Sequence, residues 1–191
     1  DESELDDTIK QPIVLMWQDA LNDLNKSPEN YHLEFRASEA FGANAFALPD
    51  GTVVVTDDLA TLLKDKPKAM LAILLHEIGH VEHQHGMQMV ARSTVTTLFF
   101  AIFFGDIDGA GELVIGASSS LIDNAFSRDM ESEADQFAIE ELKALGYSPE
   151  AFAEAMEALL EEHGDGEDYS PFLRYLSSHP DTQERIDAAK Q

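Results

Sequence analysis

The chain has 191 residues, of which 44% are hydrophobic, and this is enough apolar material to bury the core of one domain. Asp and Glu number 37 against 12 Lys and Arg, a formal net charge of -25 that repels phosphate backbones, so we expect no nucleic acid partner. The absence of Cys excludes disulfides, thiolate catalysis and thiolate-bound metal, so any metal must be held by His and carboxylate side chains.

The N-terminal segment, residues 1–10, is acidic and has no apolar run, so we expect it to be disordered. Residues 11–191 are expected to form a single domain. The chain starts at Asp1 rather than Met, and we expect targeting information to have preceded it. From Gln11, apolar residues recur at helical spacing and predict a helix that faces the core.

A small sheet is predicted next along the chain. Residues 31–36 alternate as a half-buried strand does. Two further β-prone runs, residues 44–48 and 52–56, flank Asp50-Gly51, and Asp-Gly between such runs is a strong hairpin signal. We therefore expect a hairpin with a tight turn at these two residues.

Helices are predicted after the hairpin. Asp57 or Asp58 is expected to cap a short helix. Residues 68–86 carry apolar side chains at helical spacing and predict a longer helix, with Gly86 as its stop.

Two apolar stretches, residues 98–104 and 113–122, predict a helical hairpin that belongs to the core. Each stretch is shorter than the ~20 residues that a membrane-spanning helix needs. A further helix is expected at residues 129–145, where Gly146 ends it, and Pro149 opens the next one.

The pattern H-E-x-x-H occupies residues 76–80, within the longer predicted helix. Side chains four residues apart lie on one helix face, so the imidazoles of His76 and His80 can reach one metal ion. Glu77 projects beside them, where it can accept a proton from an attacking water instead of binding the metal. Two hydrogen-bonded core histidines are the alternative that these residues leave open.

A third metal ligand must come from elsewhere, because catalytic zinc usually has three protein ligands and one open position. Glu131 and Asp135 lie four apart within the helix predicted at residues 129–145, so one helix face offers two carboxylates. The intervening Glu133 faces away from Glu131 and is expected to be solvated.

The segments HEIGHVEHQHG, SRDMESEADQFAIEELKALGYSP and SSHPDTQERI follow one another in the order and spacing of a known family. Over roughly residues 35–187 the chain resembles the metallopeptidase family of HtpX, the CAAX prenyl endopeptidases and related envelope proteases, which are gluzincins. The resemblance implies one Zn²⁺ per chain, held by His76, His80 and Glu131, with Glu77 as general base. It also implies an α+β, mainly helical zincin-like domain with a small sheet beside the motif helix.

The same resemblance assigns residues around the metal. Asp135 supports the ligands from behind, Arg185 matches the arginine of the last motif, and His179 lines the cleft and steadies the oxyanion. We assign His83 and His85 to supporting or surface roles, because further ligands would overfill the zinc.

The strand at residues 44–48 lies where this family presents an edge strand to its substrate. Unpaired backbone groups of such a strand bind an extended peptide by strand addition. The residues expected to take part are Asn44, Ala45, Phe46 and Ala47. An ordinary core strand is the alternative.

We therefore expect a zinc metalloendopeptidase that hydrolyses peptide bonds in unfolded or extended polypeptides during cell-envelope protein quality control. One alternative is a protease-like chaperone or binding module that keeps the zinc site with little proteolysis. Another is a structural zinc site, which predicts a closed shell of four ligands.

The expected partner is a polypeptide substrate. Several relatives carry transmembrane helices, so we expect contact with a membrane through an anchor preceding Asp1 or through Phe99 to Phe104. The expected location is the cell envelope, either periplasmic or membrane-associated, and the cytoplasm is the alternative.

Overall fold

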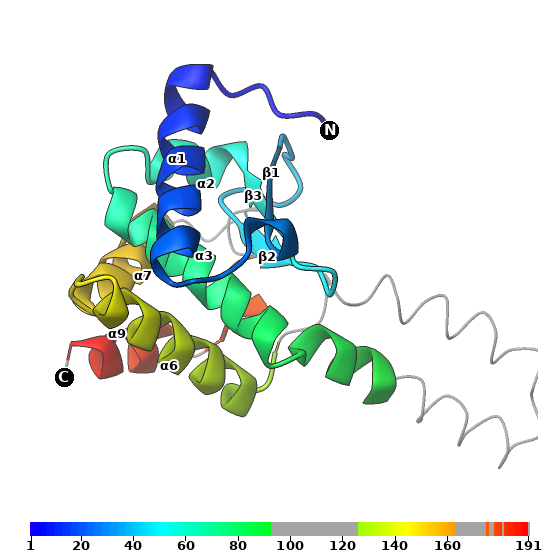
Figure 1. Ribbon diagram of the computed structural model, residues 1–191, viewed down its shortest axis with the longest axis vertical. Helices are drawn as coiled ribbons and strands as arrows, with labels where there is room; N and C mark the ends of the chain where they lie inside the picture. The colour runs from blue at the N-terminus through cyan, green and yellow to red at the C-terminus, as the bar shows by residue number, and fades with distance from the viewer. Residues whose placement is uncertain (93–125, 163–174, 176–177, 181, 191) are drawn as a thin grey trace, which may run out of the picture.

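The computed structural model describes residues 1–92, 126–162, 175, 178–180 and 182–190 (Figure 1). In chain order its helices and strands include α1 (Asp7–Asp23), η1 (Pro28–Asn30), β1 (His32–Arg36), β2 (Ala45–Ala47), β3 (Thr52–Thr56), α2 (Asp57–Leu62), α3 (Pro67–Glu82), α6 (Arg128–Ala144), α7 (Glu150–Glu162) and α9 (Thr182–Ala189). The fold is mainly helical with one small sheet, which confirms the predicted α+β class.

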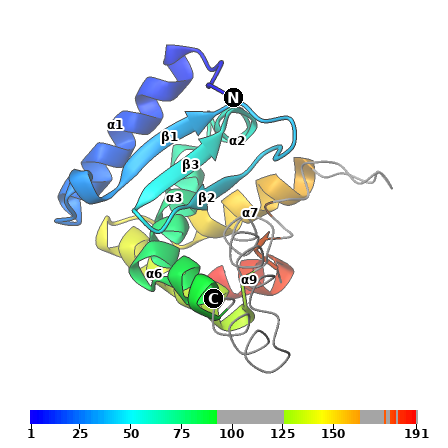
Figure 2. The same ribbon diagram turned by 90° about the vertical axis from the view of Figure 1, so that its right-hand side faces the viewer.

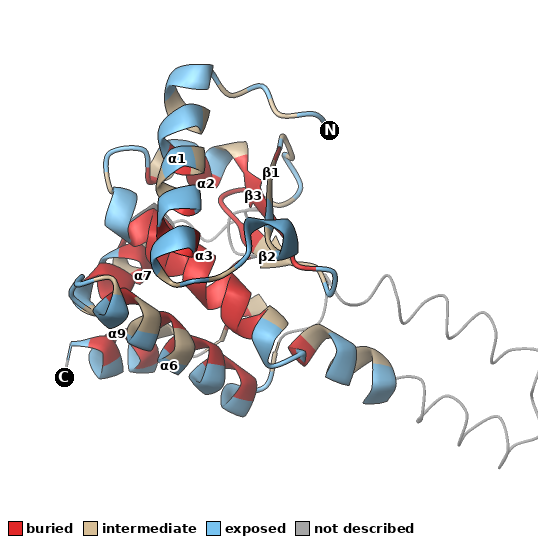
Figure 3. Cartoon of the chain, viewed as in Figure 1, coloured by how far each residue is buried: buried red, intermediate tan, exposed pale blue. Residues whose placement is uncertain are grey.

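Helix α3 runs through the middle of the molecule, between the sheet and a group of helices (Figures 1 and 2). It packs against β2, β3 and α1 on one side and against α6 and α7 on the other. Every residue from Ala69 to His80 is buried, and Figure 3 shows this as a red run along the helix. A helix that is apolar nearly all round suits this position, so the H-E-x-x-H segment lies in the interior.

The sheet is mixed, with strand order β1-β3-β2. Strand β1 runs parallel to β3, and β2 pairs antiparallel with β3, so β2 lies at an edge. The β2–β3 hairpin turns at Gly51, whose φ of +90° suits glycine and whose added Cβ would lie 2.0 Å from the Asn30 carbonyl oxygen. The predicted hairpin is confirmed, and it places an edge strand beside α3.

Helices α3 and α6 approach closely at Gly79, one residue before the second histidine of the motif. A Cβ added at Gly79 would lie 2.9 Å from the Ala134 Cα and 3.0 Å from its carbonyl oxygen. These are backbone atoms, which cannot move aside without shifting α6. The absence of a side chain at Gly79 therefore lets α6 bring its carboxylates to the motif.

Gly79→Ala should lower the free energy of unfolding by about 1–3 kcal/mol, because the extra methyl group pushes two packed helices apart. Urea unfolding of the metal-free protein measures this change. Gly86→Ala is the matched control, since its Cβ would meet only Pro49 Cγ at 3.5 Å, an ordinary contact. Equal stabilities of Gly79→Ala and wild type would contradict the close approach.

The N-terminal segment differs from the expectation of disorder at residues 1–10. Helix α1 begins at Asp7, because the Asp6 side chain accepts a backbone hydrogen bond of 2.8 Å in the first turn. The Ser3 hydroxyl donates to an Asp57 carboxylate oxygen at 2.6 Å, which ties the segment to the start of α2. The division of the chain into one domain from residue 11 stays a prediction.

Two helix ends also differ from their predicted places. Thr56 caps α2 through its side chain, rather than either of the two aspartates that follow it. Helix α3 ends at Glu82 and not at Gly86, because Gln84 adopts a left-handed backbone conformation with a φ of 55°. A new helical stretch starts immediately after this turn.

The apolar stretches at residues 98–104 and 113–122, including the proposed membrane contact at Phe99 to Phe104, lie outside the described residues. Within the described part of the chain, no helix has both the length and the hydropathy of a membrane span. The predicted helical hairpin therefore stays a prediction.

Candidate metal centre

The H-E-x-x-H segment presents both imidazoles to one point inside the protein. His76 and His80 lie one turn apart on α3, and their Nε2 atoms are 3.0 Å from each other. Both side chains are buried. The helical spacing thus gives the convergence that the sequence predicts.

Helix α6 adds a carboxylate to this pair. Glu131 lies in the first turn of α6, which Ser127 caps. Its Oε1 is 3.4 Å from His80 Nε2, and its Oε2 is 3.6 Å from His76 Nε2. The close packing of α3 on α6 therefore brings together the three residues expected to bind the metal.

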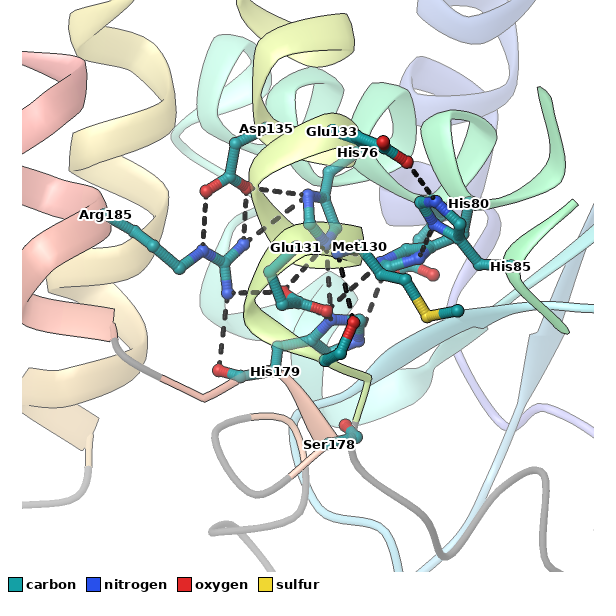
Figure 4. A network of polar contacts seen from close by, with 12 residues as sticks. His76, His80, His85, Met130, Glu131, Glu133, Asp135, Ser178, His179 and Arg185 are labelled. Atoms are coloured by element: carbon teal, nitrogen blue, oxygen red, sulfur yellow. Dashed lines mark hydrogen bonds and ion pairs between the residues drawn. The ribbon is translucent and has the colours of Figure 1, made fainter. Parts of the chain in front are cut away.

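His179 lies inside the same group (Figure 4). Its Nδ1 is 3.0 Å from Glu131 Oε1 and 3.2 Å from His76 Nε2, while its Nε2 is 3.6 Å from Glu77 Oε1. Ligand atoms of His76, His80, Glu131 and His179 all lie within 4.8 Å of one another. The structure thus places His179 among the expected ligands, and its role as oxyanion donor stays a prediction.

The charge states of the group fit a divalent cation. Burial lowers the pKa of His76, and it lowers the pKa of His80 still further, so both imidazoles are neutral and offer lone pairs. Burial opposes ionisation of Glu131, but the charge of His179 and hydrogen bonds outweigh it and lower its pKa. Neutral imidazoles and an ionised carboxylate are the ligands that zinc binds.

Glu77 is a buried carboxyl group beside the ligand group. Burial raises its pKa to about 7, and a hydrogen bond from the Ala47 backbone opposes that rise. Among the described residues its Oε1 has no hydrogen-bond partner. A carboxyl group with a free oxygen and a pKa near neutrality is suited to accept and return a proton.

Asp135 and Arg185 contact two of the residues expected to bind the metal, His76 and Glu131. Asp135 Oδ1 lies 2.9 Å from His76 Nδ1, so it can accept the proton that remains when Nε2 binds a metal. The Arg185 guanidinium donates to both oxygens of Asp135 at 2.7 and 2.6 Å, and its Nη1 lies 2.8 Å from Glu131 Oε2. Figure 4 shows this guanidinium between the two carboxylates.

The expected substrate strand has its backbone groups only partly free. The Asn44 N–H donates to the Thr56 hydroxyl, and the Asn44 carbonyl accepts from the Thr56 N–H. The Leu48 N–H donates to the Thr52 carbonyl. Because hydrogen bonds alternate along an antiparallel pair, Ala45 and Ala47 direct their backbone groups to the other edge of β2. Ala45 is buried and Ala47 is half-buried.

The side chains of Asn44 and Phe46, the other two residues of the expected substrate strand, are partly or fully buried. The Asn44 side-chain oxygen is buried and has no hydrogen-bond partner among the described residues. Phe46 is half-buried, and its ring lies 6.0 Å from that of Phe41.

Sequence patterns did not indicate the contacts that three further residues make at the site. The Phe126 ring stacks on His80 with 3.9 Å between ring centroids, and the Tyr175 ring stacks on His179 with 4.5 Å. Glu133 is exposed, as expected of a solvated side chain, and it also lies 2.9 Å from His85. These contacts join residues far apart in the chain, and no motif spacing indicates them.

Comparison with known proteins agrees with this geometry. Peptidase family M48 matches the chain over residues 15–191. The chain belongs to peptidase family M48. This confirms the resemblance to the HtpX family of metallopeptidases.

Individual M48 relatives have names that describe proteases. Metalloprotease LoiP of Escherichia coli strain K12 is 30% identical over 170 residues, which cover 86% of this chain and 62% of that protein. Protease HtpX of Pseudomonas fluorescens strain Pf0-1 is 31% identical over 192 residues, with 80% and 63% covered. Mitochondrial metalloendopeptidase OMA1 of Schizosaccharomyces pombe is 26% identical over 143 residues, with 75% and 41% covered. This M48 chain thus spans less than two thirds of the length of each.

Proposed function

We propose that this chain is a zinc-dependent metalloendopeptidase that hydrolyses peptide bonds in unfolded or extended polypeptides. The observation that carries the proposal is the buried Glu77, whose Oε1 has no hydrogen-bond partner among the described residues, beside the convergent group His76, His80 and Glu131. The chain belongs to a family whose named members are metalloproteases, and this supports the same reaction.

The residues divide the work of hydrolysis. His76, His80 and Glu131 would hold one Zn²⁺, which when bound polarises the peptide carbonyl and makes water easier to deprotonate. Glu77 takes a proton from the attacking water and returns it to the leaving amine. His179 donates from Nε2, on the Glu77 side, to the negative charge that develops on the carbonyl oxygen.

The polypeptide substrate would add to the edge of β2 that pairs with no described strand. The Ala47 backbone reaches Glu77 by a hydrogen bond, so this edge passes directly beside the general base. An extended chain added there is held by main-chain hydrogen bonds, with little dependence on its side chains. This fits unfolded polypeptides better than folded ones.

A structural zinc site would use His179 as the fourth ligand and close the shell. Such a site would not need a carboxyl group at this position. Glu77 is buried, and its Oε1 has no hydrogen-bond partner in the described part of the chain, which lowers the stability of the fold. This residue therefore favours catalysis over a structural role.

Cleavage of unfolded casein, with and without a chelator, tests the proposal. We expect cleavage by the zinc-loaded protein, loss of cleavage after chelation, and recovery when zinc is returned. A zinc-loaded protein that binds unfolded chains and prevents their aggregation, yet never cleaves them, would support the chaperone alternative instead.

We further propose a place in protein quality control of the cell envelope, on the strength of the family resemblance. Cell fractionation tests the location, and accumulation of misfolded envelope proteins in a deletion strain tests the role. Recovery of the protein from the cytoplasm alone would contradict both.

A further inference from the structure

A second group of polar side chains, His83, His85 and Glu133, lies beside the metal centre and has no part in the proposed reaction. His85 is fully buried, whereas His83 and Glu133 reach the surface. His85 directly follows Gln84, whose left-handed backbone ends α3 and turns the chain. A non-glycine residue in that conformation is uncommon, so the surrounding structure holds this turn in place.

His85 connects the two helices of the metal centre through hydrogen bonds (Figure 4). Its Nδ1 lies 2.9 Å from the Nδ1 of His80. Its Nε2 lies 2.9 Å from Oε2 of Glu133 on α6. Both separations are those of ordinary hydrogen bonds.

The proton positions along this chain of contacts are mutually consistent. When the Nε2 of His80 binds a metal, the single proton of this ring is on Nδ1, which donates to His85 Nδ1. Neutral His85 then carries its own proton on Nε2, which donates to Glu133. Every donor meets an acceptor, from the carboxylate to the ligand nitrogen.

We propose that His85 and Glu133 are positioning residues for His80 and raise the affinity of the centre for zinc. The two bonds fix the tautomer and the ring orientation of His80, and the carboxylate increases the electron density on its free nitrogen. The inference rests on the proposed metal centre. Asp135 acts on His76 directly, so α6 supports both histidines, one of them through His85.

The same geometry argues against a second metal at this group. A metal bound by His83, His85 and Glu133 would need the lone pair of His85 Nε2. The proton of His85 would then lie on Nδ1, where it faces the proton on His80 Nδ1. Two donors would point at each other, whereas the observed distance of 2.9 Å is that of a hydrogen bond.

Zinc affinity and a cobalt spectrum test the proposal in folded protein. We expect His85→Phe, which keeps the ring and loses both bonds, to bind zinc about 10–100-fold more weakly in competition with a chromophoric chelator. Glu133→Gln should lie between it and wild type, and the visible absorption of Co²⁺-loaded His85→Phe should shift. His83→Gln is the matched surface control and should match wild type in both measurements.

Wild-type zinc affinity and an unchanged cobalt spectrum in His85→Phe would overturn the proposal. Where His85→Phe does not fold, Glu133→Gln decides, and wild-type affinity in that variant overturns it equally. Two zinc ions per wild-type chain, with one lost in His83→Gln, would show a second metal site in place of the hydrogen bonds that join His80, His85 and Glu133. A wild type that takes up no zinc would refute the metal centre itself, which is a separate outcome.

Discussion

Glu77→Gln should lower kcat for peptide cleavage by about 10²–10⁴-fold while the zinc content stays that of wild type. The amide has the shape of the carboxyl group but cannot accept the proton of the attacking water. It also removes a buried carboxyl group whose ionisation burial opposes, so the variant should fold at least as stably as wild type. Steady-state kinetics on a quenched fluorescent peptide, with zinc measured on the same sample, gives both results.

Glu82→Gln is the matched control for this variant. It makes the same chemical change on the same helix, but Glu82 contacts Lys26 and Tyr31 at the surface and does not touch the metal centre. Its kcat should equal that of wild type. Cleavage by zinc-loaded Glu77→Gln at the wild-type rate would show that Glu77 is not the general base.

Arg185→Met should lower the free energy of unfolding of the metal-free protein by about 3–5 kcal/mol, because it removes the cationic partner of two buried carboxylates, which then keep only their contacts with histidines. Arg185 is 7% exposed and contacts both Asp135 and Glu131. The variant should also bind zinc more weakly, since both carboxylates lose the group that fixes their orientation. Urea unfolding and chelator competition measure the two effects.

The effect of Arg185→Met should depend on pH. In the folded protein the pKa of Asp135 is lowered, because bonds from His76 and Arg185 outweigh the opposing effect of burial. A lowered folded pKa means that the ionised pair stabilises the fold at pH values above the ordinary pKa of about 4, and that this contribution is lost as the pH falls. The difference between wild type and variant should therefore be full at neutral pH and shrink in acid.

Lys190→Met is the control for the loss of a basic side chain, because Lys190 pairs with Glu157 on the surface. Surface pairs are screened by water and salt, so little change in stability is expected. Equal stabilities of Arg185→Met and Lys190→Met at neutral pH would contradict the role given to Arg185.

The parts of the fold that follow from local signals could be predicted from the sequence. Asp50-Gly51 predicted the hairpin because few residues adopt that turn, and Gly146 ended α6 as expected, with a φ of +77°. The residues of the H-E-x-x-H pattern converge because helical spacing alone brings them together.

Features that depend on tertiary contacts could not be predicted. The start of the chain is ordered because Asp6 caps α1 and because α1 packs on the core. The composition of residues 1–10 does not indicate this packing. The contacts of Glu133 with His85 and of Phe126 with His80 depend on how α6 lies against α3. No pattern within one helix contains that information.

The sharpest test of the metal centre is the zinc content of wild type, His76→Ala and Glu131→Ala, measured by mass spectrometry, with casein cleavage assayed on the same samples. We expect one zinc per wild-type chain, with weakened zinc binding and loss of cleavage in both variants. A wild type that holds no zinc after anaerobic reconstitution, or variants that keep a full complement of zinc, would contradict this expectation.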